Sequence, residues 1–233
     1  MLRAIYNGNP NTLARPHLKG VCPHCGEEVF ARCGTHNEWH WSHKSTSQCF
    51  WLKESLNEGV WHKRMKNLFP LEWQEIYVPK NGKYKIADVL PRFGESTNIP
   101  SVEFQNSRIS PEELKYRCDF YGEVTWVFNL KAKWFKGVKI TNKQDWFQIN
   151  LPEQLRFMHL INTRGELILH HYNANYGDRF FVVDKLCFGY QKIGGYCRKV
   201  LKTQEFVDRM SGLRETIPQR LCEIIVHKRW DEV

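Results

Sequence analysis

Three features of the sequence predict a mixed α/β (α+β) fold with a small module at its N-terminus. The first fifty residues are rich in Cys and His and offer few apolar side chains for a core. Residues 51–145 alternate between helical and strand-like spacings of apolar residues. Residues 146–233 add strand-like runs and an amphipathic helix. We therefore expect a module over residues 1–50, a core over residues 51–145 and a C-terminal α/β extension over residues 146–233.

Composition and charge narrow the classes of protein to consider. A chain of 233 residues with 42% apolar and 25% charged residues can bury a sizeable core and is ordinary for a folded protein. Its net charge of +9 attracts polyanions such as nucleic acid or an anionic membrane. No apolar run approaches the ~18 residues of a membrane span, and the first ten residues lack the apolar segment of a secretory signal. We therefore expect a cytoplasmic protein with no membrane partner, whose cysteines are thiols or metal ligands.

The segment Cys22-Pro-His-Cys25-Gly predicts a metal-binding knuckle. A Cys-x-x-Cys followed by Gly turns tightly, so two thiolates point at one ion while backbone amides turn toward the sulfurs. The rival interpretation is a thioredoxin-like redox pair. It is disfavoured because we expect no strand before Cys22 and no helix after Cys25.

A zinc site needs two further ligands, and the sequence offers more than two. The candidates are Cys33, His36, His40, His43 and Cys49. We favour His43 and Cys49 as the second pair, with His40 as the alternative ligand. Because nothing nearby supplies a general base, the expected Zn²⁺ is structural.

A helix is expected over Trp51–Leu68, where apolar residues fall at near-helical spacing. The polar residues of this helix form one stripe, because they are each four apart: Glu54, Glu58, His62 and Lys66. The stripe is either a solvated face with ion-pair support or a face that brings Glu58 and His62 toward an active site. The spacing leaves both interpretations open.

Strands are expected over Trp73–Val78, Tyr84–Leu90 and Ser101–Gln105, with a hairpin turn at Asn81-Gly82 between the first two. Asp88 is a carboxylate in an otherwise apolar strand, and a buried carboxylate is costly unless it is paired or bound to a metal. Two acids on adjacent strands would make an oxygen site suited to magnesium.

A helix and another strand follow. Ser110 is the expected N-cap of a helix that runs toward Tyr121, with Glu113 completing a capping box. Gly122 ends this helix, and Val124–Leu130 is expected to form a buried strand.

Asp88 followed by Glu103-Phe-Gln105 resembles the Asp…(Asp/Glu)-x-Lys signature of restriction-endonuclease-like nucleases, with Gln in the Lys position. The whole pattern resembles the competence protein CoiA-like family over about residues 20–125. The other residues that carry the resemblance are the Cys-Pro-x-Cys knuckle, the His-Trp-Ser-His at 40–43, the series Glu58, His62 and Lys66, and Ser107 with Arg117 and Tyr121.

This resemblance implies a restriction-endonuclease-like mixed sheet flanked by helices, and a nuclease that acts on DNA and is linked to DNA uptake and processing. It implies that Asp88 and Glu103 bind one Mg²⁺ or Mn²⁺, which orients the scissile phosphate and lowers the pKa of a bound water. Gln105 would position the water or the phosphate. The remaining implied roles are metal contact through water for Glu58, phosphate contact or proton transfer for His62, and nucleic-acid contacts for Lys66, Ser107 and Arg117.

Residues 131–143 interleave lysines with Trp134 and Phe135. They either grip phosphates and stack on bases or form a solvated hairpin whose aromatic residues pack on the core. Further strands are expected over Leu167–Tyr172 and Arg179–Val183, and a helix over Thr203–Arg214.

Three functions stay open from the sequence. The first is Mg²⁺-dependent cleavage of DNA. The second is a nucleic-acid-binding protein that keeps the nuclease fold without cutting, for which Gln105 is the main argument. The third is an interaction factor for another DNA-processing protein, with the zinc module as its docking surface. Self-association is left open as well.

Overall fold

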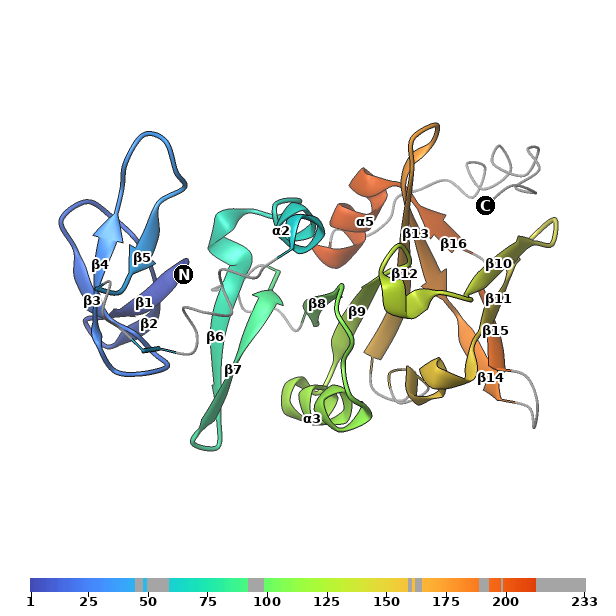
Figure 1. Cartoon of the computed structure of the whole chain (residues 1–233), viewed down its shortest axis with the longest axis horizontal. Helices are drawn as coiled ribbons and strands as arrows, with labels where there is room; N and C mark the ends of the chain where they lie inside the picture. The colour runs from blue at the N-terminus through green and yellow to red at the C-terminus, as the bar shows by residue number, and fades with distance from the viewer. Residues whose placement is uncertain are drawn as a thin grey trace. The chain divides into compact units, whose positions relative to one another are not determined.

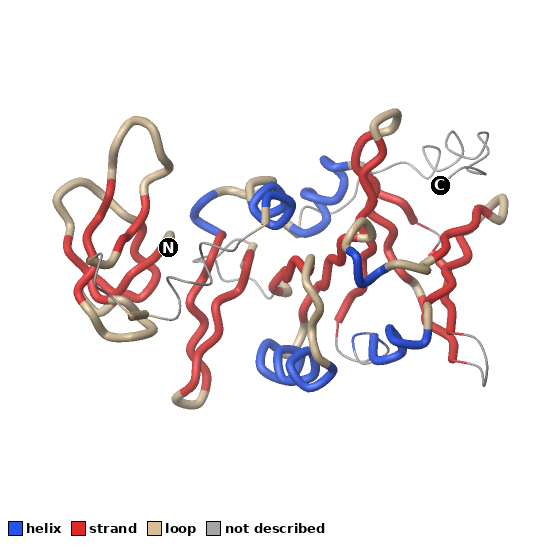
Figure 2. Tube along the Cα trace, viewed as in Figure 1, coloured by secondary structure: helices blue, strands red, loops and turns tan. Residues whose placement is uncertain are grey.

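The computed structural model describes residues 1–44, 48–49, 59–91, 99–158, 161, 165–188, 193–197 and 199–212. Two compact units, Met1–Glu95 and Ser96–Val233, divide the chain. This division differs from the expected boundaries after residues 50 and 145. The expected mixed α+β class is confirmed, and Figure 2 shows that strands outnumber helices in the described part of the chain.

The first unit begins with a small antiparallel sheet of strand order β2-β1-β3-β4-β5 (Figure 1). Its strands are β1 (Arg3–Tyr6), β2 (Asn9–Leu13), β3 (Lys19–Val21), β4 (Glu28–Arg32) and β5 (His40–Ser42). Gly20 sits where a Cβ would come within 3.2 Å of Ile5, Trp41 and Ala4, so only Gly allows the strands to approach. The expectation that no strand precedes Cys22 is wrong, because β3 ends at Val21. A strand of three residues is too short to show an apolar alternation.

A helix and a hairpin complete the first unit. They are α2 (Val60–Lys66), a 3-10 turn η1 (Leu71–Trp73), β6 (Gln74–Lys80) and β7 (Lys83–Val89). Asn81 and Gly82 both have positive φ, as the predicted hairpin turn requires. Residues 51–58 of the expected helix lie outside the described residues. The helix ends at Lys66, before the expected Leu68, and Asn67 caps it by donating its backbone amide to the carbonyls of Lys63 and Met65.

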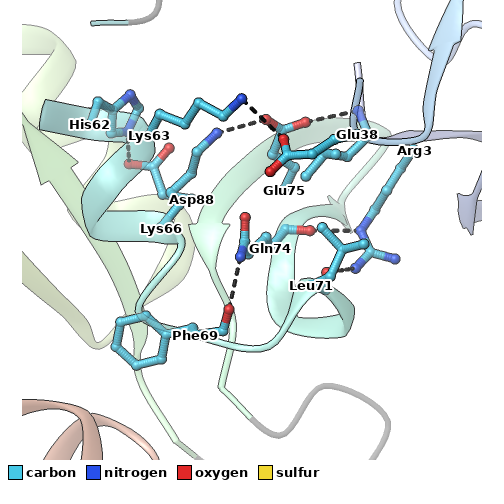
Figure 3. A network of polar contacts seen from close by, with 11 residues as sticks. Arg3, Glu38, His62, Lys63, Lys66, Phe69, Leu71, Gln74, Glu75 and Asp88 are labelled. Atoms are coloured by element: carbon cyan, nitrogen blue, oxygen red, sulfur yellow. Dashed lines mark hydrogen bonds and ion pairs between the residues drawn. The ribbon is translucent and has the colours of Figure 1, made fainter. Parts of the chain in front are cut away.

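The N-terminal sheet and the hairpin form one unit because two side chains bond to backbone across them. The buried Arg3 guanidinium donates to the carbonyls of Gln74 (2.7 Å), Glu72 (2.7 Å) and Leu71 (3.0 Å), and Figure 3 shows Arg3 beside Leu71 and Gln74. The side-chain amide of Asn11 pairs with the backbone of Tyr77 in the way a neighbouring strand would. It accepts from Tyr77 N at 2.7 Å and donates to Tyr77 O at 3.1 Å. Residue 50 is therefore not a boundary between compact units.

The second unit contains a βαβ element, β8 (Ser101–Gln105), α3 (Pro111–Tyr121) and β9 (Val124–Asn129). The two strands are parallel, with register running from Ser101↔Val124 to Gln105↔Phe128. The Ser110 hydroxyl caps α3 by accepting from Glu113 N at 3.1 Å, and Gly122 with φ 84° ends it. The sequence therefore predicts this element correctly.

The C-terminal part of the chain continues the same sheet, which explains why no unit boundary falls near residue 145. β12 (Gly165–Asn173) pairs parallel with β9, and β13 (Gly177–Val183) pairs antiparallel with β12 and with β16 (Lys199–Leu201). The helix α5 (Thr203–Met210) stacks Phe206 on Phe180, with ring centroids 4.0 Å apart. The expected strands at residues 167–172 and 179–183 are both present, and residues 213–214 of the expected last helix lie outside the described part.

A second sheet in this unit has the strand order β10-β11-β15-β14. It is made from β10 (Lys139–Asn142), β11 (Phe147–Leu151), β14 (Lys185–Phe188) and β15 (Ile193–Cys197), and the 3-10 turns η2 (Lys133–Phe135) and η3 (Glu153–Met158) adjoin it in the chain.

Burial decides between the two interpretations of residues 131–143. Phe135 is 2% exposed and packs on Phe128, and Trp134 packs on the same core while donating its indole N–H to Asn106 O at 3.1 Å. These aromatic residues therefore pack on the core, and the base-stacking interpretation is wrong for Phe135. Cys118 and Cys197 are buried thiols, whereas the side chains of Cys187 and Cys222 are not among those that the structure describes. No helix among the described residues is both long and apolar enough to cross a membrane.

Candidate functional site

The first candidate site is a cysteine–histidine cluster formed by Cys22, Cys25, His43 and Cys49. Their ligand atoms all lie within 4.8 Å of one another, and Cys25 Sγ is 3.3 Å from His43 Nε2. Zinc bonds of about 2.0–2.3 Å in a tetrahedron place ligand atoms at comparable separations. Three sulfurs and one imidazole nitrogen are also the donors that zinc prefers. The cluster could therefore hold a structural metal such as zinc.

The knuckle that carries Cys22 and Cys25 begins directly after β3. Cys22 N donates to Glu27 O at 2.8 Å, Gly26 N donates to Cys22 O at 3.0 Å, and His24 N points at Cys22 Sγ from 3.4 Å. Gly26 adopts the positive φ of 74° that the turn requires. The knuckle geometry expected from the sequence is therefore present.

Burial makes this cluster favourable for a cation. It raises the pKa of the Cys22 thiol to about 12, so a bare thiolate there is costly and a bound cation offsets that cost. Burial also lowers the pKa of His43, which keeps its imidazole neutral and able to ligate. Both shifts suit a metal site better than a redox pair.

The other candidates lie outside the cluster. His40 bonds through Nδ1 to Glu38 O at 2.8 Å, so the favoured set with His43 and Cys49 is the set that the structure assembles. Cys33 lies in the connection between β4 and β5, as does His36. His24, inside the knuckle, contacts the Tyr84 hydroxyl of β7 at 2.9 Å, which connects the cluster to the strand that carries Asp88.

The second candidate site is the pair formed by His62 of α2 and Asp88 of β7. His62 Nε2 lies 2.9 Å from Asp88 Oδ2, and their side chains are 25% and 18% exposed. Figure 3 shows the imidazole above the carboxylate. The pair is half-buried, so His62 does not lie on a solvated face, and its imidazole contacts the Asp88 carboxylate. Glu58, the other acid expected here, lies outside the described residues.

Lys66 lies one helical turn after His62 and contacts the carboxylate of Glu75, which no sequence motif marks. Its ammonium is 2.7 Å from Glu75 Oε1, and the side chain is 5% exposed. Glu75 Oε2 accepts from the backbone N–H of Leu2 at 3.1 Å. The expected phosphate contact of Lys66 is therefore wrong, because this face of α2 packs on the β6–β7 hairpin instead of facing solvent.

Glu75 is the missed residue of this network. Burial alone would raise the pKa of its carboxyl, but the adjacent Lys66 ammonium and the Leu2 amide hold that pKa below its ordinary value. The register Gln74↔Val89 and Ile76↔Ala87 brackets Glu75 and Asp88, so the two acids occupy facing positions on β6 and β7. The sequence did hold a signal for an acidic partner of Lys66. If the polar stripe of α2 is buried, its lysine needs a nearby carboxylate.

The third candidate site lies in the second unit, around Glu103 of β8. Glu103 is 1% exposed and its Oε2 accepts from Arg117 Nη1 at 2.7 Å. Arg117 Nε also donates to Glu113 Oε1 at 2.7 Å. Arg117 therefore bridges two carboxylates, which differs from the direct nucleic-acid contact that the resemblance implies. The expected capping box is therefore only half formed. The Glu113 carboxylate accepts from Arg117 and does not turn back to the backbone N–H of Ser110.

Gln105 and Ser107 lie at the end of the same strand. Gln105 Nε2 donates to Ser107 O at 2.7 Å and to Ser107 Oγ at 3.2 Å. The structure therefore brings Glu103 together with Arg117, and Gln105 with Ser107. Asp88 belongs to the first unit and Glu103 to the second.

Replacing Arg117 by Met should lower the free energy of unfolding by about 3 kcal/mol, because it leaves the Glu103 carboxylate buried without its guanidinium. The matched control is Lys115→Met on the same helix. Lys115 forms an exposed pair with Asp119, so its loss should cost no more than about 0.5 kcal/mol. Urea denaturation of both variants measures the difference, and equal effects would show that the Arg117 bridge is not stabilising.

A buried His–Asp pair was not assigned from the sequence. His170 is fully buried and its Nε2 lies 2.8 Å from Asp178 Oδ1, with its ring against Phe180. Thr203, at the start of α5, donates its hydroxyl to Asp178 Oδ2 at 3.4 Å. The pair joins β12, β13 and α5, which is a structural role.

The chain thus has a mixed α+β fold with a cysteine–histidine cluster in its N-terminal sheet. Residues 14–51 match the family model described as competence protein CoiA, N-terminal domain. The matched segment contains all four residues of the cluster, and it confirms the resemblance to CoiA-like proteins over this module. No curated protein and no solved structure matches the chain.

Proposed function

We propose that the chain is a metal-dependent nuclease that hydrolyses DNA phosphodiester bonds and has a structural zinc in its N-terminal module. The observation that supports this most is the buried carboxylate of Glu103 on the first strand of a parallel βαβ element. A carboxylate at 1% exposure is costly unless cations surround it, and Mg²⁺ prefers such oxygen ligands. The CoiA match over residues 14–51 supports a role in competence.

In this proposal Asp88 and Glu103 ligate one Mg²⁺ or Mn²⁺. Both fit the ion by donor chemistry, since carboxylates are hard oxygen ligands. When bound, the ion would polarise the scissile phosphate and lower the pKa of an attacking water.

The chain's own side chains would complete the reaction. His62, whose Nε2 lies 2.9 Å from Asp88 Oδ2, would contact the phosphate or carry a proton. Arg117 would act as a positioning residue that holds one oxygen of Glu103. Gln105, held by Ser107, would orient the water or the phosphate without adding charge. The role of Glu58 stays a prediction.

A second candidate function is a DNA-binding protein that keeps this arrangement but does not cut. Gln105 favours it. Its neutral amide, hydrogen-bonded to Ser107, cannot supply the positive charge of the lysine that nucleases of this kind have at this position. The net charge of +9 suits either function.

Cleavage of linear, circular and single-stranded DNA in Mg²⁺, Mn²⁺ or EDTA tests the proposal, with zinc-loaded protein throughout. We expect cleavage that needs the metal and falls by at least about a thousandfold in Asp88→Ala and in Glu103→Ala. The control variant is Asp119→Ala, an acid of the exposed α3 surface. Binding without cleavage by folded protein would favour the second candidate, and neither binding nor cleavage would favour a protein partner.

A further inference from the structure

The first unit contains a pocket of about 490 Å³ that the proposed reaction does not use. This volume lies within the range of roughly 300–1,000 Å³ typical of ligand sites. Leu13, Phe69 and Leu71 form apolar parts of its wall, and they come from the end of β2 and from the segment that joins α2 to β6. The connection between β4 and β5 supplies Glu38 and Trp39 to the wall.

Trp39, in that connection, lines the pocket and is 48% exposed. Because it stands in the wall of a pocket, Trp39 offers a large apolar face that a bound ligand could cover. Its flat indole is suited to stacking on another flat ring, and every nucleobase offers such a face.

The polar groups of the lining are suited to a phosphate-bearing ligand. Arg15 lines the pocket and is exposed, and its long side chain carries a guanidinium that could pair with a bound phosphate. The acid of the lining, Glu38, is 3.0 Å from the Lys63 ammonium, which offsets its charge. Asn67 is exposed and carries an amide that can both donate and accept hydrogen bonds.

The pocket shares its elements with the His62–Asp88 pair. Lys63, the partner of Glu38, directly follows His62 in α2. Phe69 and Leu71 of the lining lie in the connection after α2, and Gln74 begins β6. Figure 3 shows the Glu38–Lys63 pair and these lining residues in one view with His62 and Asp88. A strand bound in the pocket would therefore run close to the helix that carries His62.

We propose that this pocket binds one unpaired base of single-stranded DNA, stacked on Trp39, with an adjacent phosphate held by Arg15. A base within a duplex is stacked on both faces and cannot enter such a pocket without being extruded. The inference rests on the proposed function and makes an unpaired segment part of its substrate.

Fluorescence anisotropy with a labelled oligothymidylate, in zinc-loaded full-length protein without added Mg²⁺, tests this inference. We expect Trp39→Ala to weaken binding about 5- to 100-fold, the range for one lost base–aromatic stack, and Trp39→Phe to stay within about threefold of the wild type. Arg15→Gln should weaken binding and reduce its dependence on salt. The matched control is Trp146→Ala, because Trp146 is 38% exposed but lies in the second unit.

Two outcomes overturn the inference. One is single-strand binding that Trp39→Ala leaves unchanged, or that Trp146→Ala weakens equally. The other is the absence of single-strand binding by the wild type, which would assign the pocket to a different ligand, such as a protein side chain. Metal-dependent cleavage of duplex DNA, measured with the same proteins, tests the proposed function separately. If Trp39→Ala binds single-stranded DNA normally and still cleaves duplex DNA, the base-binding role of the pocket is wrong and the proposed nuclease function stands.

Discussion

Cys22→Ser is expected to remove bound zinc and to unfold the N-terminal sheet. Cys22 is 1% exposed and supplies one of the four ligand atoms of the cluster. Structural zinc contributes about 10–16 kcal/mol to folding in isolated zinc-binding peptides at neutral pH, so the loss of one ligand removes a large share of the module's stability. The apolar core of the sheet contributes little stability of its own, since it consists of a few small residues around Trp41.

Zinc content by mass spectrometry and amide hydrogen exchange over residues 1–44 measure this effect. We expect about one zinc per chain in the wild type, almost none in Cys22→Ser, and fast exchange in β3 and β4 of the variant. The matched control is Cys33→Ser, because Cys33 lies nearby but outside the cluster. Full zinc content in Cys22→Ser, or zinc loss in Cys33→Ser, would show that another set of residues binds the metal.

The loss of zinc should also affect the strand that carries Asp88. His24 of the knuckle contacts Tyr84 of β7, and Asn11 of β2 pairs with Tyr77 of β6. If the N-terminal sheet unfolds, these contacts are lost and the β6–β7 hairpin loses its neighbour. We therefore expect faster exchange in the hairpin as well.

Lys66→Met is expected to lower the free energy of unfolding by about 3–5 kcal/mol, the usual cost of removing one partner of a buried ion pair. Lys66 is 5% exposed and Glu75 is 20% exposed, so the carboxylate left behind cannot be fully solvated. The double variant Lys66→Met with Glu75→Gln should recover much of the loss, because no buried charge then remains. Lys63→Met is the control, since its partner Glu38 is more than half exposed and the pair contributes at most about 1 kcal/mol.

The effect of Lys66→Met should depend on pH. The pKa of Glu75 is lower in the folded chain than its ordinary value of 4.5, so the pair stabilises the fold fully above that value. As the pH falls below about 4.5 and through the folded pKa, the carboxylate is protonated and this contribution is lost. Urea denaturation at pH 7 and at acid pH should therefore show the gap between wild type and variant narrowing. A gap that is constant or widens with acid would contradict the role assigned to the pair.

Local patterns predicted most of the elements correctly. The Asn81-Gly82 turn, the Ser110 cap and the alternation in Ser101–Gln105 each depend on neighbouring residues, and the structure has all three. The structure also brings together the four residues favoured as ligands, although the same segment offers other candidates such as Cys33 and His40. Such features are encoded within short stretches of chain.

The features that the sequence did not reveal depend on contacts between distant residues. The parallel pairing of β12 with β9 joins the C-terminal part to the sheet, and nothing in either strand specifies that partner. Glu75 faces Lys66 only because α2 packs on the hairpin, and Arg117 reaches Glu103 only because α3 lies against β8. Lys66 and Arg117, which the sequence suggested as DNA contacts, therefore form ion pairs with buried or partly buried carboxylates.

The number of Mn²⁺ ions bound by zinc-loaded protein, measured by calorimetric titration, tests the central claim most directly. The proposal that Asp88 and Glu103 ligate one ion predicts one Mn²⁺ per chain in the wild type. It also predicts that Asp88→Asn and Glu103→Gln each abolish this binding while the zinc content stays unchanged. Binding that survives in both variants, or a wild type that binds no Mn²⁺ while fully folded, would contradict the proposal of a metal-dependent nuclease.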